Sequence, residues 1–141
     1  MNTFTRNIIE NKTRVRILLA DDDKSVLSAL RLALEQQPHV VIVGEVGDTG
    51  RLMHWAIENT ADLLVVDWEL PGRDIKTVLP LLRNLNPGLK VIALNSRPQI
   101  VTEAMAAGAD AFISKADPPE KLLEVLNIFC RSIFVAQQRS S

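Results

Sequence analysis

The chain has little of what would mark a secreted, membrane-bound or nucleic-acid-binding protein. Its one cysteine, Cys130, cannot form an internal disulfide, which favours a reducing compartment. Its 16 basic and 17 acidic residues give a formal net charge of −1, which provides no electrostatic attraction to nucleic acid or membranes. It has no apolar run of transmembrane length and no signal-peptide-like apolar stretch near the N-terminus. We therefore expect a cytoplasmic protein that contacts neither membrane nor nucleic acid through this chain.

The bulk composition predicts one globular domain. The chain has 141 residues, of which 47% are hydrophobic and 23% are charged, the profile of a domain with a real core. Residues 1–14 are polar and show no period, so we expect an N-terminal extension there. We predict that the domain spans residues 15–135 and that residues 136–141 form a short C-terminal tail. No DNA-binding or catalytic output domain is expected in this chain.

Short apolar runs alternate with amphipathic stretches along the domain. The runs are rich in Val, Ile and Leu, as expected of strands buried on both faces. They cover Val15–Ala20, Val40–Gly44, Leu63–Val66, Val91–Leu94 and Ala111–Ser114. Three-four spacing of apolar residues predicts the helices between them, including a short one over Gln99–Ala107 and a last one over Pro119–Phe134. Pro80 should kink or shorten the third helix. The alternation predicts a parallel sheet with helices on both faces.

Polar side chains follow four of these strands. Asp21–Asp23 come after the first strand, Asp67 after the third, Asn95 after the fourth and Lys115 after the fifth. These ends share one edge of a parallel sheet, the edge at which open α/β sheets bind ligands. Adjacent carboxylates repel, and a hard cation such as Mg²⁺ removes that cost, with Lys115 as a further counter-charge. The alternative for the acidic run is a helix N-cap, a position that Asp favours.

Three motifs at these strand ends, taken together and in order, resemble the receiver domains of two-component response regulators, the chemotaxis receiver among them. They are ILLADDD at residues 17–23, DLLVVDWELPG at residues 62–72 and GADAFISK at residues 108–115. The resemblance covers the chain from Val15 to about Phe134. It implies a flavodoxin-like α/β fold, a doubly wound five-stranded parallel sheet in the order 2-1-3-4-5 with helices on both faces.

The resemblance also implies a role for each residue of the site. Asp67 is the expected phosphoryl acceptor, and its donor is a histidine kinase, a phosphotransfer protein or a small phosphodonor. Asp21, Asp22 and Asp67, with the backbone carbonyl of Glu69, are the expected Mg²⁺ ligands. Lys115 is expected to pair with Asp67 before the transfer and with a phosphoryl oxygen afterwards.

The relay that follows phosphorylation departs from the family's pattern. Asn95 stands where the family usually has Ser or Thr, whose hydroxyl turns toward the phosphoryl group, although Phe112 fits the aromatic switch position. The segment from Asn95 to Lys115 is shorter than in the chemotaxis receiver, so the fourth helix or its leading loop should be truncated. We therefore expect a weaker or different conformational response. Glu69 and Arg97 are expected at opposite lips of the pocket, where an ion pair could slow loss of the phosphoryl group.

Three further expectations concern residues near the site. Asp23 should cap the helix that follows it. Trp68 should lie at the rim of the site. The stretch Gly44–Gly50 lacks a dinucleotide fingerprint, and we expect an ordinary loop there.

The leading interpretation is a stand-alone receiver that signals through a phosphorylation-dependent contact with an unidentified downstream protein. The resemblance places that contact, and a possible homodimer, on the fourth helix, fifth strand and fifth helix, at Ile100, Met105, Phe112 and Leu122. No separate substrate turnover is expected, so we do not predict an enzyme. The alternatives are a constitutive pseudo-receiver, a phosphohydrolase with Asp67 as nucleophile, and the receiver part of a longer transcription regulator.

Overall fold

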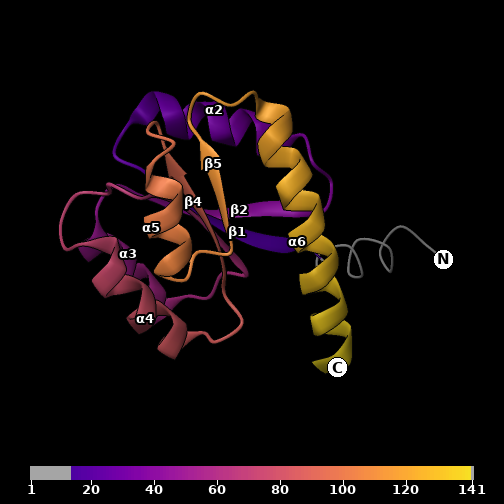
Figure 1. The fold of residues 1–141 in the computed structure, drawn as a ribbon. Helices are drawn as coiled ribbons and strands as arrows, with labels where there is room; N and C mark the ends of the chain where they lie inside the picture. The colour runs from indigo at the N-terminus through magenta and orange to yellow at the C-terminus, as the bar shows by residue number, and fades with distance from the viewer. Residues whose placement is uncertain (1–13, 141) are drawn as a thin grey trace.

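A parallel β-sheet forms the centre of the molecule (Figure 1). The structure is a computed structural model that describes residues 14–140, so the expected extension over residues 1–14 lies almost wholly outside the described residues. Within this part of the chain the sheet has five strands in the order β2-β1-β3-β4-β5, with every neighbouring pair parallel. They are β1 (Val15–Ala20), β2 (Val40–Val46), β3 (Leu63–Asp67), β4 (Lys90–Asn95) and β5 (Ala111–Ser114). The predicted fold class is confirmed.

Helices cover both faces of the sheet. They are α2 (Lys24–Glu35), α3 (Thr49–Glu58), α4 (Ile75–Leu85), α5 (Ile100–Ala106) and α6 (Pro119–Ser140). One hydrophobic core lies under α2 and α6, where Leu34 and Leu126 are almost wholly buried. The other lies under α3, α4 and α5, where Leu52 and Leu79 are equally buried. The sheet is therefore enclosed on both faces, and its polar residues can emerge only at its edges.

Strand β1 illustrates why the acidic run falls at such an edge. Its side chains alternate between the two cores: Ile17 and Leu19 pack under α2 and α6, and Leu18 packs on the other face. Burying each of these side chains stabilises the fold by about 2 kcal/mol. The strand ends at Ala20, which pairs with Val66 of β3, so the next residue on each strand lies at the carboxyl edge of the sheet.

The stretch Gly44–Gly50, expected to be an ordinary loop, belongs largely to regular elements. Strand β2 continues to Val46, and α3 begins at Thr49. The pairing of β1 with β2 shifts register between Ile17 and Leu18, which brings Gly44 opposite Leu18. Gly44 lies under the indole of Trp55, and a Cβ there would come within 2.7 Å of the Trp55 Nε1 atom. The glycine therefore permits close packing of helix on strand rather than a turn.

One expectation about a helix was also wrong, and a second was wrong in part. Helix α6 runs to Ser140, beyond the expected end at Phe134, and the side chain of Gln137 donates a hydrogen bond of 3.4 Å to Asp62. Helix α4 runs through Pro80, an exposed residue, and is not shortened there, while the alternative that Pro80 kinks the helix stays a prediction. The missing N–H of Pro80 removes the hydrogen bond to the carbonyl of Lys76, which is also an exposed residue. No helix within residues 14–140 has the length and apolar character needed to cross a membrane.

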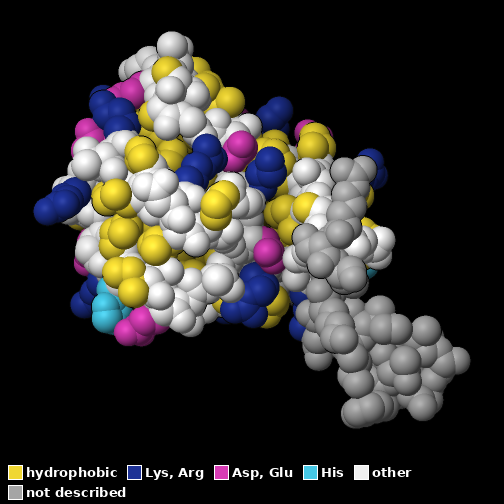
Figure 2. Space-filling view, turned by 90° about the horizontal axis from the view of Figure 1, so that it is seen from below, with side chains coloured by type: hydrophobic (Ala, Val, Ile, Leu, Met, Phe, Trp, Pro, Cys, Tyr) yellow, Lys and Arg dark blue, Asp and Glu magenta, His cyan; other side chains and the backbone are white. Residues whose placement is uncertain are grey.

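The edge opposite the acidic run exposes hydrophobic side chains beside charged residues such as Asp62, Lys90 and Asp110. Hydrophobic side chains gather on the face seen from below, on the side where α3 and α4 lie (Figure 2). The ends of these helices enclose a hollow of about 40 Å³, lined by Trp55, Leu82 and Leu85 among others. The carboxylates of Asp21, Asp22 and Asp67 lie at the carboxyl edge of the sheet.

Candidate functional site

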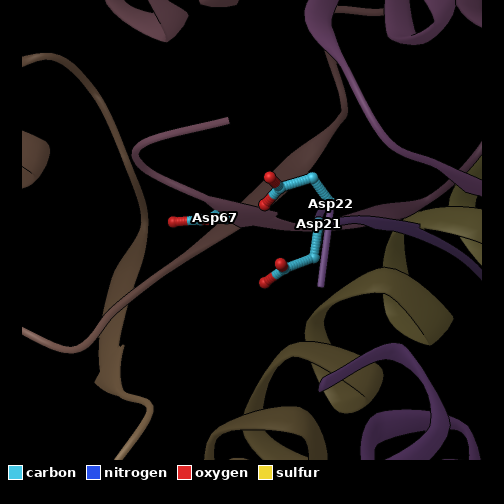
Figure 3. Close-up of side chains that lie close together, drawn as sticks. All are labelled: Asp21, Asp22 and Asp67. Atoms are coloured by element: carbon cyan, nitrogen blue, oxygen red, sulfur yellow. The ribbon is translucent and has the colours of Figure 1, made fainter. Parts of the chain in front are cut away.

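Three carboxylates meet at the carboxyl edge of the sheet. Asp21 and Asp22 follow β1, and Asp67 is the last residue of β3. One oxygen from each lies within 4.8 Å of the others. Figure 3 shows the carboxylates of Asp21 and Asp22 flanking that of Asp67, with all three directed out of the same edge. Asp21 is fully buried and Asp67 is 6% exposed, whereas Asp22 is open to solvent.

Backbone hydrogen bonds fix the two buried carboxylates. The Asp21 Oδ1 atom accepts from the N–H of Asp23 at 2.9 Å, and the Asp67 Oδ1 atom accepts from the N–H of Glu69 at 3.0 Å. Each carboxylate is thus held by the loop that follows its own strand. This orients the remaining oxygens toward the centre of the cluster.

Lys115 provides the counter-charge that the sequence predicted. Its Nζ atom lies 2.7 Å from Asp21 Oδ2 and 3.2 Å from Asp67 Oδ2. Burial lowers the pKa of Lys115, but the hydrogen bond with Asp21 and the charge of Asp67 outweigh it, so this pKa lies above its ordinary value. Burial raises the pKa of Asp21 by more than the hydrogen bond from Lys115 lowers it. The ammonium therefore stays protonated at neutral pH, while the Asp21 carboxylate holds its charge at a cost.

The cluster has the composition of a cation site. Among the described residues, three carboxylates face one ammonium, which leaves two negative charges unbalanced. The carboxylate of Asp22 has no hydrogen-bond or ion-pair partner within residues 14–140. A set of oxygen ligands around an excess of two negative charges suits a hard divalent ion. The acidic cluster can therefore bind a metal ion.

The loop after Asp67 is docked onto the start of α3. The carbonyl of Pro71 accepts a hydrogen bond of 2.9 Å from the N–H of Thr49, which is 2% exposed. Gly72 has a φ of +105°, and a Cβ there would lie 2.4 Å from the Thr49 Oγ1 atom. Only glycine fits at this position. Thr49 is a supporting residue that sequence reasoning missed, because nothing in the local pattern connects it to a loop more than twenty residues away.

The opposite lip of the site is formed after β4. Asn95 is 1% exposed, and its Oδ1 atom accepts a hydrogen bond of 2.9 Å from the N–H of Arg97. The Arg97 guanidinium contacts the carboxylate of Glu69, so the expected ion pair is present, with both side chains about half exposed. Sequence reasoning missed the turn at Asn95, although an asparagine that bonds the N–H two residues on is a known turn pattern.

The other residues predicted near this lip divide between the two cores. Phe112 is half-buried and packs, with Ile100, against the core under α3, α4 and α5. Helix α5 has seven residues, which confirms the short helix expected from the sequence. Met105 is 44% exposed, as a contact surface requires. Leu122 was wrongly placed on that surface, because it is 4% exposed and packs in the core under α2 and α6.

The expectation for Asp23 was confirmed, whereas the expectation for Trp68 was wrong. Asp23 caps α2 as expected, since its side chain accepts from the N–H groups of Ser25 at 2.9 Å and Val26 at 3.4 Å. Trp68 does not lie at the rim, because it is 5% exposed. Its backbone N–H donates to the carbonyl of Leu94 at 2.8 Å, which extends the pairing of β3 with β4 by one residue. The alternation of the strand then directs the indole into the core with Val66.

Comparison with known proteins shows the family. The family model of the response regulator receiver domain matches residues 17–127. The chain is 26% identical over 117 residues to the DNA-binding transcriptional regulator NtrC of Azospirillum brasilense, and 26% identical over 121 residues to the nitrate/nitrite response regulator protein NarL of Escherichia coli. These matches cover 83% and 84% of this chain. The chain spans 24% of the length of NtrC and 56% of the length of NarL.

Solved structures of response regulators are similar to this chain in fold and sequence. The isolated receiver domain of RcsB from Salmonella enterica serovar Typhimurium, in the presence of phosphomimetic BeF3−, matches with a TM-score of 0.73 and 28% identity, over 81% of this chain and 86% of that one. A structure of the Salmonella typhimurium RcsB response regulator matches with a TM-score of 0.77 and 26% identity, over 84% of this chain and 60% of that one. This chain belongs to the response regulator receiver domain family, the signalling modules of two-component systems.

Proposed function

We propose that this chain is a Mg²⁺-dependent receiver that accepts a phosphoryl group on Asp67. The donor is a histidine kinase, a phosphotransfer protein or a small phosphodonor, and the setting is the cytoplasm. The observation that carries the proposal is the position of Asp67, between the Lys115 ammonium at 3.2 Å and the carboxylates of Asp21 and Asp22. No separate substrate turnover is part of the proposal.

The residues present account for the transfer. A carboxylate oxygen of Asp67 forms a bond to phosphorus, while the bond from phosphorus to the donor's histidine nitrogen breaks and its electron pair leaves with that nitrogen. Lys115, already paired with this carboxylate, stays paired with the oxygens of the transferred group and offsets their charge. The N–H of Glu69, which donates to Asp67 Oδ1, keeps the carboxylate from rotating away from the incoming group.

The acidic cluster fits the divalent ion that the family implies. Asp21, Asp22 and Asp67, with the backbone carbonyl of Glu69, would hold Mg²⁺. When bound, the ion would neutralise charge on the transferring phosphoryl group. The unpartnered carboxylate of Asp22 and the two unbalanced negative charges of the cluster support this assignment.

The output is a contact with a downstream protein, controlled by the phosphoryl group. We propose the exposed surface of α5, β5 and α6, including Met105, for this contact and for a possible homodimer. A second candidate is the receiver part of a longer transcription regulator, because the curated relatives extend well beyond the length that this chain spans.

A Mg²⁺ titration followed by tryptophan fluorescence tests the proposal, since Trp68 directly follows Asp67. We expect saturable binding that weakens at least about tenfold in Asp22→Asn, which removes one charged ligand. Glu124→Gln, which removes an exposed acid on α6, should bind like the wild type. If the three proteins respond equally to Mg²⁺, or if none of them responds, the pseudo-receiver is favoured instead. Steady hydrolysis of a phosphomonoester would favour the phosphohydrolase.

A further inference from the structure

Arg97 connects the acidic site to the start of α5. Its guanidinium contacts the carboxylate of Glu69 on the opposite lip. Its backbone N–H donates to the Asn95 side chain at 2.9 Å, and its carbonyl accepts from the N–H of Ile100, the first residue of α5, at 3.1 Å. One residue is therefore bonded to both lips of the site and to a helix of the proposed contact surface.

We propose that Arg97 is a second cationic ligand of the phosphoryl group on Asp67, and that its exchange of Glu69 for this group moves the start of α5. The inference rests on the proposed function, because it requires that Asp67 is phosphorylated. It assigns to Arg97 the task that a serine or threonine hydroxyl would perform at the position of Asn95.

The charges at the site favour the exchange. The N–H of Glu69 lies 3.0 Å from Asp67 Oδ1, so the Glu69 carboxylate belongs to a residue in direct contact with the acceptor. Phosphorylation adds roughly one further negative charge there, which repels the Glu69 carboxylate and attracts the guanidinium. The phosphoryl oxygens can also accept two parallel hydrogen bonds from the planar guanidinium of an arginine, which binds phosphate in a bidentate manner. The pair that must break is half exposed, and such pairs contribute little stability.

Asn95 is poorly placed to act alone. It is 1% exposed, and its side-chain oxygen is engaged by the N–H of Arg97. The amide therefore cannot turn toward the phosphoryl group unless the turn at residues 95–97 moves with it. A displacement of Arg97 therefore moves the turn. It also displaces Ile100, because the N–H of Ile100 donates a hydrogen bond to the Arg97 carbonyl. Ile100 packs in the same core as Phe112, so the movement reaches the aromatic position.

The test uses beryllofluoride with Mg²⁺ as the phosphoryl mimic. The proteins are wild type, Arg97→Met and Arg97→Lys, with Arg73→Met as the matched control. Arg73 is an exposed arginine on the same loop as Glu69, so its substitution makes the same change of charge near the site. Tryptophan fluorescence gives the affinity for the mimic, and hydrogen exchange over residues 95–107 reports on α5.

We expect Arg97→Met to bind the mimic about fivefold more weakly, and its α5 exchange to be unaffected by the mimic. Arg97→Lys should recover part of the affinity, since lysine keeps the positive charge but cannot make the bidentate hydrogen bonds of a guanidinium. Arg73→Met should match the wild type in both measurements.

If Arg97→Met binds as tightly as Arg73→Met and keeps the α5 response, the inference is wrong. If wild type binds the mimic and α5 does not respond, the coupling is wrong while the proposed function stands. If the wild type does not bind the mimic, the proposed function fails and this inference fails with it.

Discussion

The two halves of the site are held in place by different means. The acceptor half, defined as Asp21, Asp22, Asp67 and Lys115, is built on strand ends, and its ion pairs of 2.7 and 3.2 Å join largely buried groups. The relay half, defined as Asn95, Arg97 and Phe112, depends on a turn, a half-exposed ion pair and a helix of seven residues. Within the described residues, no side chain caps the N-terminus of that helix.

This difference separates the chemistry of the site from its output. The sheet fixes the acceptor half whatever happens at its surface, because displacing Asp67 or Asp21 would break buried strand pairing. The relay half can move at lower cost, because its ion pair is half exposed and α5 is a short helix in which only Ala104 is fully buried. A receiver can therefore keep its phosphoryl chemistry while its response to phosphorylation is altered. The substitutions below probe first one half and then the other.

Lys115→Met should have the largest effect on stability. It leaves the buried carboxylates of Asp21 and Asp67 without their ammonium, and we expect the free energy of unfolding to fall by about 2 kcal/mol without divalent ions. Mg²⁺ should restore part of the loss. The raised pKa of Lys115 means that its contribution is fully present below the ordinary value of 10.5 and is lost only as pH rises above it. Chemical denaturation measures the change, with Lys121→Met, an exposed lysine of α6, as control. Equal losses in the two variants would refute this view of the acceptor half.

Asp21→Asn should instead stabilise the protein at neutral pH, because a neutral side chain avoids the cost of burying the Asp21 charge. Burial raises the pKa of Asp21 above its ordinary value of 3.8, so the folded protein binds this proton more tightly than the unfolded chain. The contribution of Asp21 to stability therefore falls as pH rises from about 3.8 through the raised pKa. Denaturation at a series of pH values should show the variant gaining over the wild type across that window. A difference that does not change with pH would contradict this account.

Arg97→Ala tests the relay half. Arg97 pairs with Glu69 before phosphorylation and is proposed to bind the phosphoryl group afterwards. Removal of its side chain opens the mouth of the site to water, and we expect the phosphoryl half-life to shorten about three- to fivefold. Decay of the phosphorylated species, followed by intact mass, measures it, and Arg73→Ala controls for the loss of a positive charge. An unchanged half-life in Arg97→Ala would contradict a role of Arg97 in retaining the phosphoryl group.

Asn95→Thr should have the smallest effect. It places a hydroxyl where the amide oxygen now anchors the turn to Arg97, and it restores the residue type that the family's relay uses. We expect a modest increase in the change of tryptophan emission on phosphorylation, with no change in the amount of phosphoryl group taken up. If the emission change is the same as in the wild type, Asn95 does not limit the relay.

The acceptor half could be predicted from the sequence because strands impose strict order. A short run rich in Val, Ile and Leu between helical patterns indicates a strand of a parallel sheet, and the polar residue that follows it lies at the carboxyl edge of that sheet. Asp21, Asp67 and Lys115 were placed together by this reasoning, and their contacts in the structure agree. The roles of these residues as phosphoryl acceptor and metal ligands stay predictions, since they depend on chemistry that geometry alone does not test.

The errors arose where a single residue decides the structure. Trp68 was misplaced because β3 pairs with β4 for one residue more than its apolar run indicates. Leu122 was misplaced because the resemblance names a helix and not the face of that helix. The end of α6 was missed because the apolar period fades after Phe134, while good helix formers and the contact of Gln137 with Asp62 carry the helix onward. The domain boundaries at residues 15 and 135 therefore stay predictions.

Intact mass after incubation with acetyl phosphate tests the central claim most directly. Wild type and Asp67→Asn are compared with and without Mg²⁺. The account predicts a gain of one phosphoryl group in the wild type that requires Mg²⁺ and is absent in Asp67→Asn. No gain in a folded wild-type protein, or an equal gain in Asp67→Asn, would contradict it.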